Sequence, residues 1–208
     1  MKVFFIRHGE SLANLNLTSS LFSNDRNNRL TNIGKKQIGR VAKTINSGVS
    51  IVYSSPMHRA IESAQEFLFW YDKETRFMVD DRLREIDYGI YTDNRGNYEM
   101  NEITRRQIAG DYEVRFGGGE NKREIITRFF AFLIDCYDKH MDESIIVFSH
   151  GRAISMVESE FCKINHLEKQ HIHTSNGAVK ELDIDTKAVS CMQKRINSLN
   201  KMNQKMSA

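Results

Sequence analysis

Two short apolar runs, far apart in the sequence, end in the same way. Val3–Ile6 is a run of four apolar residues followed by Arg-His-Gly at 7–9. Ile145–Phe148 is a second such run, and Ser-His-Gly follows it at 149–151. A continuous apolar run of this length is typical of a strand that is buried on both faces of a parallel sheet. The pattern therefore predicts two buried strands, each with a histidine where the strand ends.

The remainder of the chain alternates between helical and extended patterns. Apolar positions at helical spacing predict helices at about 31–48, 56–71, 121–140 and 151–163. Short apolar runs predict strands at 49–53, 77–79 and 178–184. This alternation predicts an α/β fold of three α/β/α layers, in which a mostly parallel sheet has helices on both faces.

The expected domain organisation is simple. Residues 1–192 are long enough to form a single domain with a buried sheet. The segment at about 91–119 has no clean strand pattern and is expected to be an insertion of helix and loop, with a glycine hinge at 117–119. Residues 193–208 are expected to form a basic C-terminal tail, which either docks an apolar helix face on the body or frays.

Charge and composition bear on the partners. The net charge of the 208-residue chain is +3, but 193–208 holds four cations and no acid, which leaves the remainder at −1. A short tail of dispersed cations is a weak signal for nucleic acid. No apolar run approaches the roughly 20 residues that cross a bilayer. We therefore expect neither a nucleic-acid nor a membrane partner, while a homodimer is left open.

The cysteines and histidines bear on the compartment and on metals. Three scattered cysteines without C-x-x-C spacing favour a reducing, cytoplasmic location over a disulfide framework or a zinc ribbon. The start of the chain has too few apolar residues for the core of a signal peptide. His171-x-His173 lacks a third ligand at metal-binding spacing. We therefore expect no metal and no cofactor.

The predicted strand ends bring candidate catalytic groups to one edge of the sheet. Ligands of open α/β sheets bind at the carboxyl ends of the strands. That edge is expected to carry a common set of polar residues: Arg7, His8, Asn14, Arg59 and His150. Two guanidinium groups match the geometry of a phosphoryl group, and a histidine can attack phosphorus through one ring nitrogen. Glu85 is the candidate acid that protonates the departing oxygen.

Five motifs, in this order and approximate spacing, resemble those of the histidine phosphatase superfamily, which has the phosphoglycerate mutase-like fold. They are Arg7-His8-Gly9-Glu10, Ser54-Ser55-Pro56-x-x-Arg59-Ala60, Leu83-x-Glu85, Gly118-Gly119-Glu120 and Ser149-His150-Gly151. Leu30-Thr31-x-x-Gly34-x-x-Gln37 extends the resemblance, which covers most of the chain.

The resemblance implies a role for each matching residue. His8 corresponds to the histidine that is phosphorylated, and Glu85 corresponds to the proton donor. The phosphate is held by residues that match Arg7, Asn14, Arg59, His150 and Gly151. The activity so implied is that of a metal-independent phosphomonoesterase that hydrolyses small phosphorylated metabolites through a phosphohistidine.

The chain also departs from the family pattern in three places. Tyr91-Thr92-Asp93 replaces an aromatic residue followed by Glu-Gly, Asn121 follows Gly-Gly-Glu, and Arg152 follows His-Gly. These changes leave the catalytic groups in place and bear on the pocket wall. Arg152 is either a cation at the rim of the site or a solvated charge.

Three functional hypotheses remain at this point. Leu-Arg-Glu-Ile-Asp-Tyr-Gly at 83–89, and a spacing of only 65 positions from Glu85 to His150, favour the phosphatase branch over a bisphosphoglycerate-dependent phosphoglycerate mutase. A non-catalytic binding protein of the same fold is the third. The structural alternatives are a loop cap for Asn14, an ion pair with Arg82, Arg84 or Arg59 for Glu85, and a plain strand-end histidine for His8.

Overall fold

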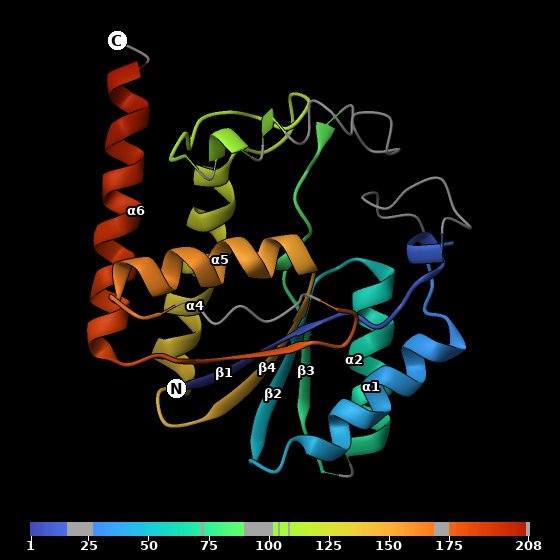
Figure 1. Ribbon diagram of the computed structural model, residues 1–208. Helices are drawn as coiled ribbons and strands as arrows, with labels where there is room; N and C mark the ends of the chain where they lie inside the picture. The colour runs from blue at the N-terminus through green and yellow to red at the C-terminus, as the bar shows by residue number, and fades with distance from the viewer. Residues whose placement is uncertain are drawn as a thin grey trace.

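The computed structural model describes residues 1–15, 27–71, 73–89, 102–103, 105–107, 109–168 and 175–206. Its strands form one sheet in the order β3-β2-β4-β1-β5 (Figure 1). They are β1 (Lys2–Arg7), β2 (Val49–Ser54), β3 (Arg76–Val79), β4 (Ser144–Ser149) and β5 (Val179–Asp183). Strand β4 runs parallel to β1 and β2, β3 runs parallel to β2, and β5 runs antiparallel to β1. The expected, mostly parallel sheet is confirmed.

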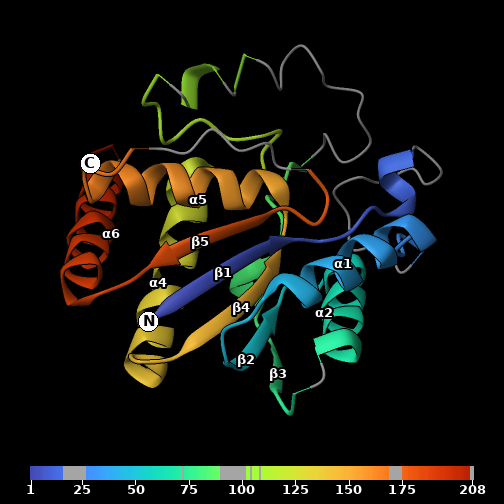
Figure 2. The same ribbon diagram turned by 60° about the horizontal axis from the view of Figure 1, so that its bottom comes forward.

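Helices cover both faces of this sheet, which confirms the expected three layers (Figure 2). Alternate residues of β1 show why: Val3 and Phe5 belong to one apolar core, whereas Phe4 and Ile6 belong to the other. Helices α1 (Asn32–Thr44) and α2 (His58–Tyr71) pack over the face of Phe4. Helices α4 (Lys122–His140), α5 (Gly151–Ile164) and α6 (Thr186–Met206) pack over the face of Phe5.

Side-chain caps fix where two of these helices begin. The Thr31 hydroxyl accepts from the Gly34 N–H at the start of α1. At the start of α4, Asn121 and Glu124 form a capping box in which each side chain accepts from the other's backbone N–H. Both devices satisfy N–H groups that have no partner within the helix. Two short 3-10 helices, η1 (Leu12–Leu15) and η2 (Asp81–Leu83), lie in connections beyond β1 and β3.

Strand register decides which residues meet at the carboxyl edge. Arg7 pairs with Ser149, so the histidines that follow them, His8 and His150, leave adjacent strands side by side. Ser54 at the end of β2 pairs with Phe148 of β4. The ends of three strands therefore lie together, and each is followed by a segment that carries candidate catalytic groups.

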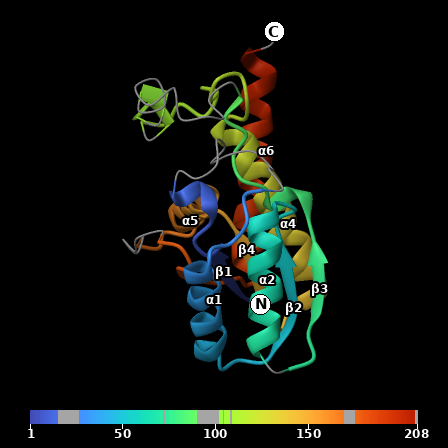
Figure 3. The ribbon, with the colours of Figure 1, turned by 90° about the vertical axis from the view of Figure 1, so that its right-hand side faces the viewer.

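The expected boundary between the body and the tail falls inside α6. This helix continues past the sheet toward the C-terminus (Figure 3). Ile196 and Leu199 are buried in the core cluster that includes α4, so this part of the basic segment is packed on the body. Among the described helices, none combines the length and the apolar character needed to cross a bilayer.

Candidate active site

His8 is the first residue after β1, and its imidazole is 4% exposed. Its Nδ1–H donates to the backbone carbonyl of Gly9 at 2.8 Å, because a carbonyl oxygen can only accept. The lone pair is therefore on Nε2, which accepts from Nε of Arg59 at 3.2 Å. Burial, with the charges of Arg59 and Arg7, holds the pKa of His8 well below its ordinary value. The ring is neutral at pH 7, and Nε2 is its nucleophilic atom.

Two guanidinium groups lie beside this imidazole. Arg59, in the first turn of α2, is 2% exposed, and burial lowers its pKa to about 10. Arg7 ends β1, and burial lowers its pKa as well. A Cβ atom on Gly151 would lie 3.1 Å from Cδ of Arg7, so Arg7 runs directly against the start of α5. Two guanidinium groups that are shielded from water beside a nucleophile favour binding of an anionic ligand there.

His150 adds a second imidazole from β4. Its ring centroid lies 5.3 Å from that of His8, and the side chain is completely buried. Nε2 is 2.8 Å from the hydroxyl oxygen of Ser55. That oxygen accepts from the Met57 N–H, so its own proton can be donated to Nε2, which places the ring proton of His150 on Nδ1. Burial, Arg59 and His8 hold the pKa of His150 well below its ordinary value. Nδ1 has no hydrogen bond to a described residue, so it remains available to a phosphoryl oxygen.

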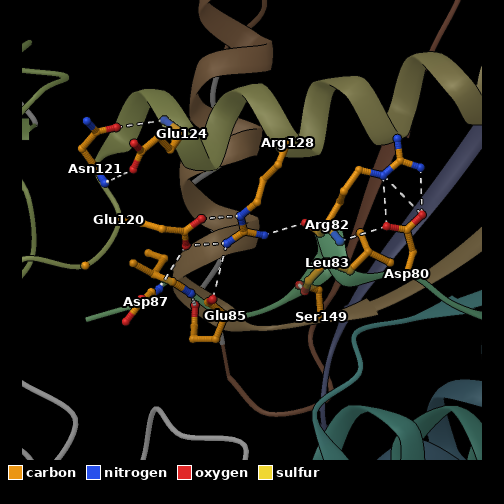
Figure 4. Close-up of polar contacts among 12 residues, drawn as sticks. Asp80, Arg82, Leu83, Glu85, Asp87, Glu120, Asn121, Glu124, Arg128 and Ser149 are labelled. Atoms are coloured by element: carbon orange, nitrogen blue, oxygen red, sulfur yellow. Dashed lines mark hydrogen bonds and ion pairs between the residues drawn. The ribbon is translucent and has the colours of Figure 1, made fainter. Parts of the chain in front are cut away.

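Glu85 follows η2, in a segment that β4 holds in place. The Ser149 hydroxyl donates to the Leu83 carbonyl at 2.8 Å, which ties this segment to the strand before His150 (Figure 4). One carboxyl oxygen of Glu85 accepts from the Ile86 N–H at 3.0 Å. Burial raises the pKa of Glu85, although the Ile86 N–H and the charge of Arg59 oppose the shift. A carboxyl group that keeps its proton nearer neutral pH is suited to general acid catalysis.

Arg128 of α4 fixes the same segment from behind, a role that sequence reasoning missed. Its Nη1 donates to the Arg82 carbonyl at 2.5 Å, and its Nη2 lies 3.4 Å from the Glu85 carbonyl (Figure 4). Its Nε and Nη2 also donate to the two carboxylate oxygens of Glu120, at 2.8 and 3.0 Å. Glu120 in turn accepts from the Asp87 N–H at 3.0 Å.

The glycine tract at 117–119 is a packed turn instead of the expected hinge. A Cβ atom on Gly119 would lie 2.2 Å from the Asp87 carbonyl oxygen, and one on Gly89 would lie 2.1 Å from that of Gly117. Gly118 has φ +81°, a conformation that favours glycine. The tract therefore closes tightly against the loop that follows Glu85, and glycine is needed for close approach.

The segment Thr31–Gln37 clamps the loop that follows His8. The Thr31 hydroxyl donates to the Glu10 carboxylate at 2.6 Å, and the Gln37 side-chain oxygen accepts from the Glu10 N–H at 2.8 Å. Between these residues, a Cβ atom on Gly34 would lie 2.1 Å from the Glu10 carbonyl oxygen. Leu-Thr-x-x-Gly-x-x-Gln is thus a set of contacts that fixes the backbone next to His8.

Asn14 lies in η1 and stabilises the local loop. Its side-chain oxygen accepts from the N–H of Ser11 at 3.0 Å and from Nδ2 of Asn176 at 3.1 Å. The same Asn176 amide is 3.1 Å from the His8 carbonyl oxygen. The loop-cap alternative is therefore observed, and phosphate binding by Asn14 stays a prediction.

Ser63 and Asn176 are further supporting residues that the sequence did not reveal. Ser63 accepts from the Gly9 N–H at 3.1 Å and donates to the Arg59 carbonyl at 2.7 Å, so it links the two catalytic segments. It follows Arg59 by four positions on the same helix face, and this spacing is a signal that could have identified it. Asn176 lies 168 positions from His8, and no local pattern connects them.

Several residues named in the sequence analysis lie outside the part of the chain that the structure describes. His171, His173 and Tyr91 lie outside the described residues, as do 91–101, 104 and 108 of the insertion expected at about 91–119. Within the described residues, no group of three or more His, Cys, Asp or Glu side chains is arranged to hold a metal ion. Tyr112, near the end of the insertion, donates to buried Glu160 of α5.

Comparisons with known proteins show the family and the fold. The family model described as "Histidine phosphatase superfamily (branch 1)" matches residues 3–197. Phosphoserine phosphatase 1 of Hydrogenobacter thermophilus is 28% identical over 155 residues, which cover 72% of this chain and 71% of the relative. Two solved structures share the fold. One is an Entamoeba histolytica phosphoserine phosphatase variant with phosphoserine (22% identity, TM-score 0.68, covering 89% of this chain and 91% of that chain). The other is a Bacillus anthracis phosphoglycerate mutase (15% identity, TM-score 0.70, covering 94% of this chain and 96% of that chain).

Because the family model spans nearly the whole chain, the chain belongs to the histidine phosphatase superfamily, branch 1. Within it, the chain is a phosphomonoester hydrolase with the phosphoglycerate mutase-like fold.

Proposed function

We propose that this protein hydrolyses small phosphorylated metabolites through a phosphohistidine on His8, without a metal ion. Nε2 of His8 attacks phosphorus, the bond from phosphorus to the ester oxygen breaks, and Glu85 gives its proton to the departing alkoxide. Water then attacks the phosphohistidine while the Glu85 carboxylate takes up one proton. The second step releases inorganic phosphate and restores both groups.

The tautomer of His8 is the observation that carries this proposal. The bond from Nδ1–H to the Gly9 carbonyl leaves the lone pair on Nε2, the atom that faces Arg59. A buried neutral imidazole needs no base to remove a proton before it attacks. Arg7, Arg59 and His150 supply fixed donors for charge that develops on the phosphoryl oxygens, which is the main requirement of phosphoryl transfer.

The charge states of the two reacting residues support their assigned roles. The lowered pKa keeps His8 neutral, as a nucleophile must be, and the raised pKa favours the protonated form of Glu85, as an acid must be. Arg82, one of the alternative partners for Glu85, forms ion pairs with Asp80 and Asp135 instead. Opposite perturbations of two neighbouring groups are typical of acid–base sites.

The direct test is hydrolysis of 4-nitrophenyl phosphate by the wild type and by His8→Ala. We expect the variant to lose turnover, and we expect the alkali-stable, acid-labile phosphohistidine seen after rapid quenching of the wild type to disappear. His58→Ala, a histidine in α2 outside the set, is the matched control and should keep both. Treatment with EDTA should leave the rate unchanged. Turnover by His8→Ala, or a rate that EDTA abolishes, would contradict the mechanism.

The phosphoglycerate mutase reaction is the second candidate, because this chain shares its fold with a mutase. Incubation of 3-phosphoglycerate with and without a bisphosphate primer separates the two activities. We expect release of inorganic phosphate to exceed isomerisation, with no stimulation by primer. Faster isomerisation would assign the chain to the mutases, and absence of both reactions on every phosphorylated metabolite would favour a binding protein.

We place this activity in the cytoplasm. The proposal is supported by the spacing of Cys136, Cys162 and Cys191, which has no C-x-x-C pair and favours a reducing compartment. Cell fractionation with an antibody to the protein tests the location, and recovery in a secreted or membrane fraction would contradict it.

A further inference from the structure

The start of α5 places Arg152 one residue beyond the phosphate-binding groups. His150 is the N-cap of this helix, and Gly151, its first residue, lies against the side chain of Arg7. Arg152 follows directly and is exposed. Its charge therefore stands at the border of the proposed site, on an element that the catalytic histidine itself begins.

An aromatic platform holds this guanidinium. Cζ of Arg152 lies 5.7 Å from the ring centroid of Tyr88, within cation–π range. Tyr88 is 1% exposed, and its ring packs on Phe116 with centroids 5.0 Å apart. Among the described residues, no carboxylate lies within ion-pair distance of Arg152. A cation held on a fixed ring and not neutralised by these neighbours is well placed to receive an anion from solution.

Tyr88 and Arg152 lie on the side of the site from which the alcohol half of the substrate leaves. The phenol of Tyr88 lies near two opposite charges: Glu85 acts to raise its pKa and Arg152 acts to lower it. Under the proposed mechanism Glu85 protonates the ester oxygen, so the alcohol half of the substrate begins beside Glu85. Tyr88 and Arg152 therefore border the alcohol half, on the opposite side of phosphorus from the attacking nitrogen of His8.

We propose that Arg152 binds an anionic group, such as a carboxylate, on the alcohol half of the substrate. The preferred substrates are then phosphomonoesters with a second negative charge a few bonds from the ester oxygen. The planar guanidinium suits bidentate contact with such a group. This inference rests on the proposed function, because it uses Glu85 to locate the leaving group.

Matched substrate pairs test the inference. O-Phosphoserine and O-phosphoethanolamine differ by one carboxylate, and 3-phosphoglycerate and glycerol 3-phosphate differ by a carboxylate in place of an alcohol. We expect the wild type to show a higher kcat/KM, by about tenfold, for the anionic member of at least one pair, as one charge-assisted contact provides. Arg152→Gln should bring that ratio close to one, mainly through KM, and Arg152→Lys should give an intermediate ratio.

Two controls separate this inference from the function itself. Lys163→Gln removes the same charge from the last turn of α5 and should keep the wild-type ratio. Arg152→Gln should hydrolyse 4-nitrophenyl phosphate within about twofold of the wild type, because that ester carries no second anion. An unchanged ratio in Arg152→Gln, or a wild type without preference in either pair, overturns the role of Arg152. Failure of the wild type on 4-nitrophenyl phosphate itself would overturn the proposed function.

Discussion

Removal of the Arg128 side chain should damage catalysis only where a proton must be delivered to the leaving group. Arg128 connects the Glu120 carboxylate with the carbonyls of Arg82 and Glu85 through its guanidinium. Its side chain is 14% exposed and that of Glu120 is 19% exposed. Arg128→Met keeps most of the apolar stem and removes every one of these bonds.

The expected loss of stability follows from leaving Glu120 without its partner in a mostly dry environment. Breaking such a pair costs about 3 kcal/mol in the free energy of unfolding. For a chain of this size, that corresponds to a fall in Tm of about 6 to 12 °C. In the folded fraction, Glu85 loses the contact that fixes its backbone, and a shift of about 1 Å in a catalytic group lowers the rate by up to about 100-fold.

The assay compares two leaving groups at a temperature where the variant is folded. 4-Nitrophenolate is a weak base and leaves without much protonation, whereas the alkoxide of glycerol 3-phosphate needs a proton. Arg128→Met should therefore lose far more kcat toward glycerol 3-phosphate than toward 4-nitrophenyl phosphate. Arg128→Lys keeps the positive charge but lacks the planar guanidinium with its several donors, so its kcat toward glycerol 3-phosphate should fall somewhat less.

Arg115→Met is the matched control for Arg128→Met. Arg115 also pairs with a carboxylate, that of Glu124, and also donates to the glycine tract at the Gly119 carbonyl. It has no bond to the Glu85 segment, and its side chain is 45% exposed. It should lose about 1 kcal/mol or less and keep the wild-type ratio of the two rates. Equal losses on both substrates in Arg128→Met would refute the positioning role.

Four further outcomes are expected. Gly34→Ala forces a Cβ atom to 2.1 Å from a backbone oxygen of the loop after His8, so it should lower Tm and activity together; Gly48→Ala, with nothing within 4 Å, should change neither. Because the pKa of His8 is lowered in the folded protein, only the unfolded chain binds this proton just below about pH 6.5, so native stability decreases as the pH is lowered. His8→Asn lacks this loss. In urea denaturation, its free energy of unfolding relative to that of the wild type should therefore rise by up to about 1.4 kcal/mol when the pH is lowered from about 7.5 to 5.5. The raised pKa of Glu85 places loss of its proton on the alkaline limb of kcat/KM for glycerol 3-phosphate, and Glu85→Gln should be slow and lack that limb. Light scattering should give the mass of a homodimer, since edge strand β3 exposes apolar side chains, and Met78→Lys should yield monomers; a monomeric wild type contradicts this expectation.

Much of the fold could be predicted because its signals are local. Four-residue apolar runs at β1 and β4 indicated buried strands, and apolar positions at helical spacing indicated α1 and α4, which the structure confirms. The tail was harder to predict. Whether Ile196 and Leu199 dock or fray depends on an apolar surface formed largely by α4, and nothing within 193–208 describes that surface.

The sequence by itself also determined which groups are candidates for the reaction: their types, their order and their positions at strand ends predict that His8, Arg59, Glu85 and His150 form one chemical set. Only the tertiary structure decided how they are tuned and held. The neutral ring of His8 depends on burial and on the Gly9 carbonyl, and the raised pKa of Glu85 depends on burial near α5. Solvation and hydrogen-bond direction are properties of packed three-dimensional surroundings, and residues brought together from distant positions create them.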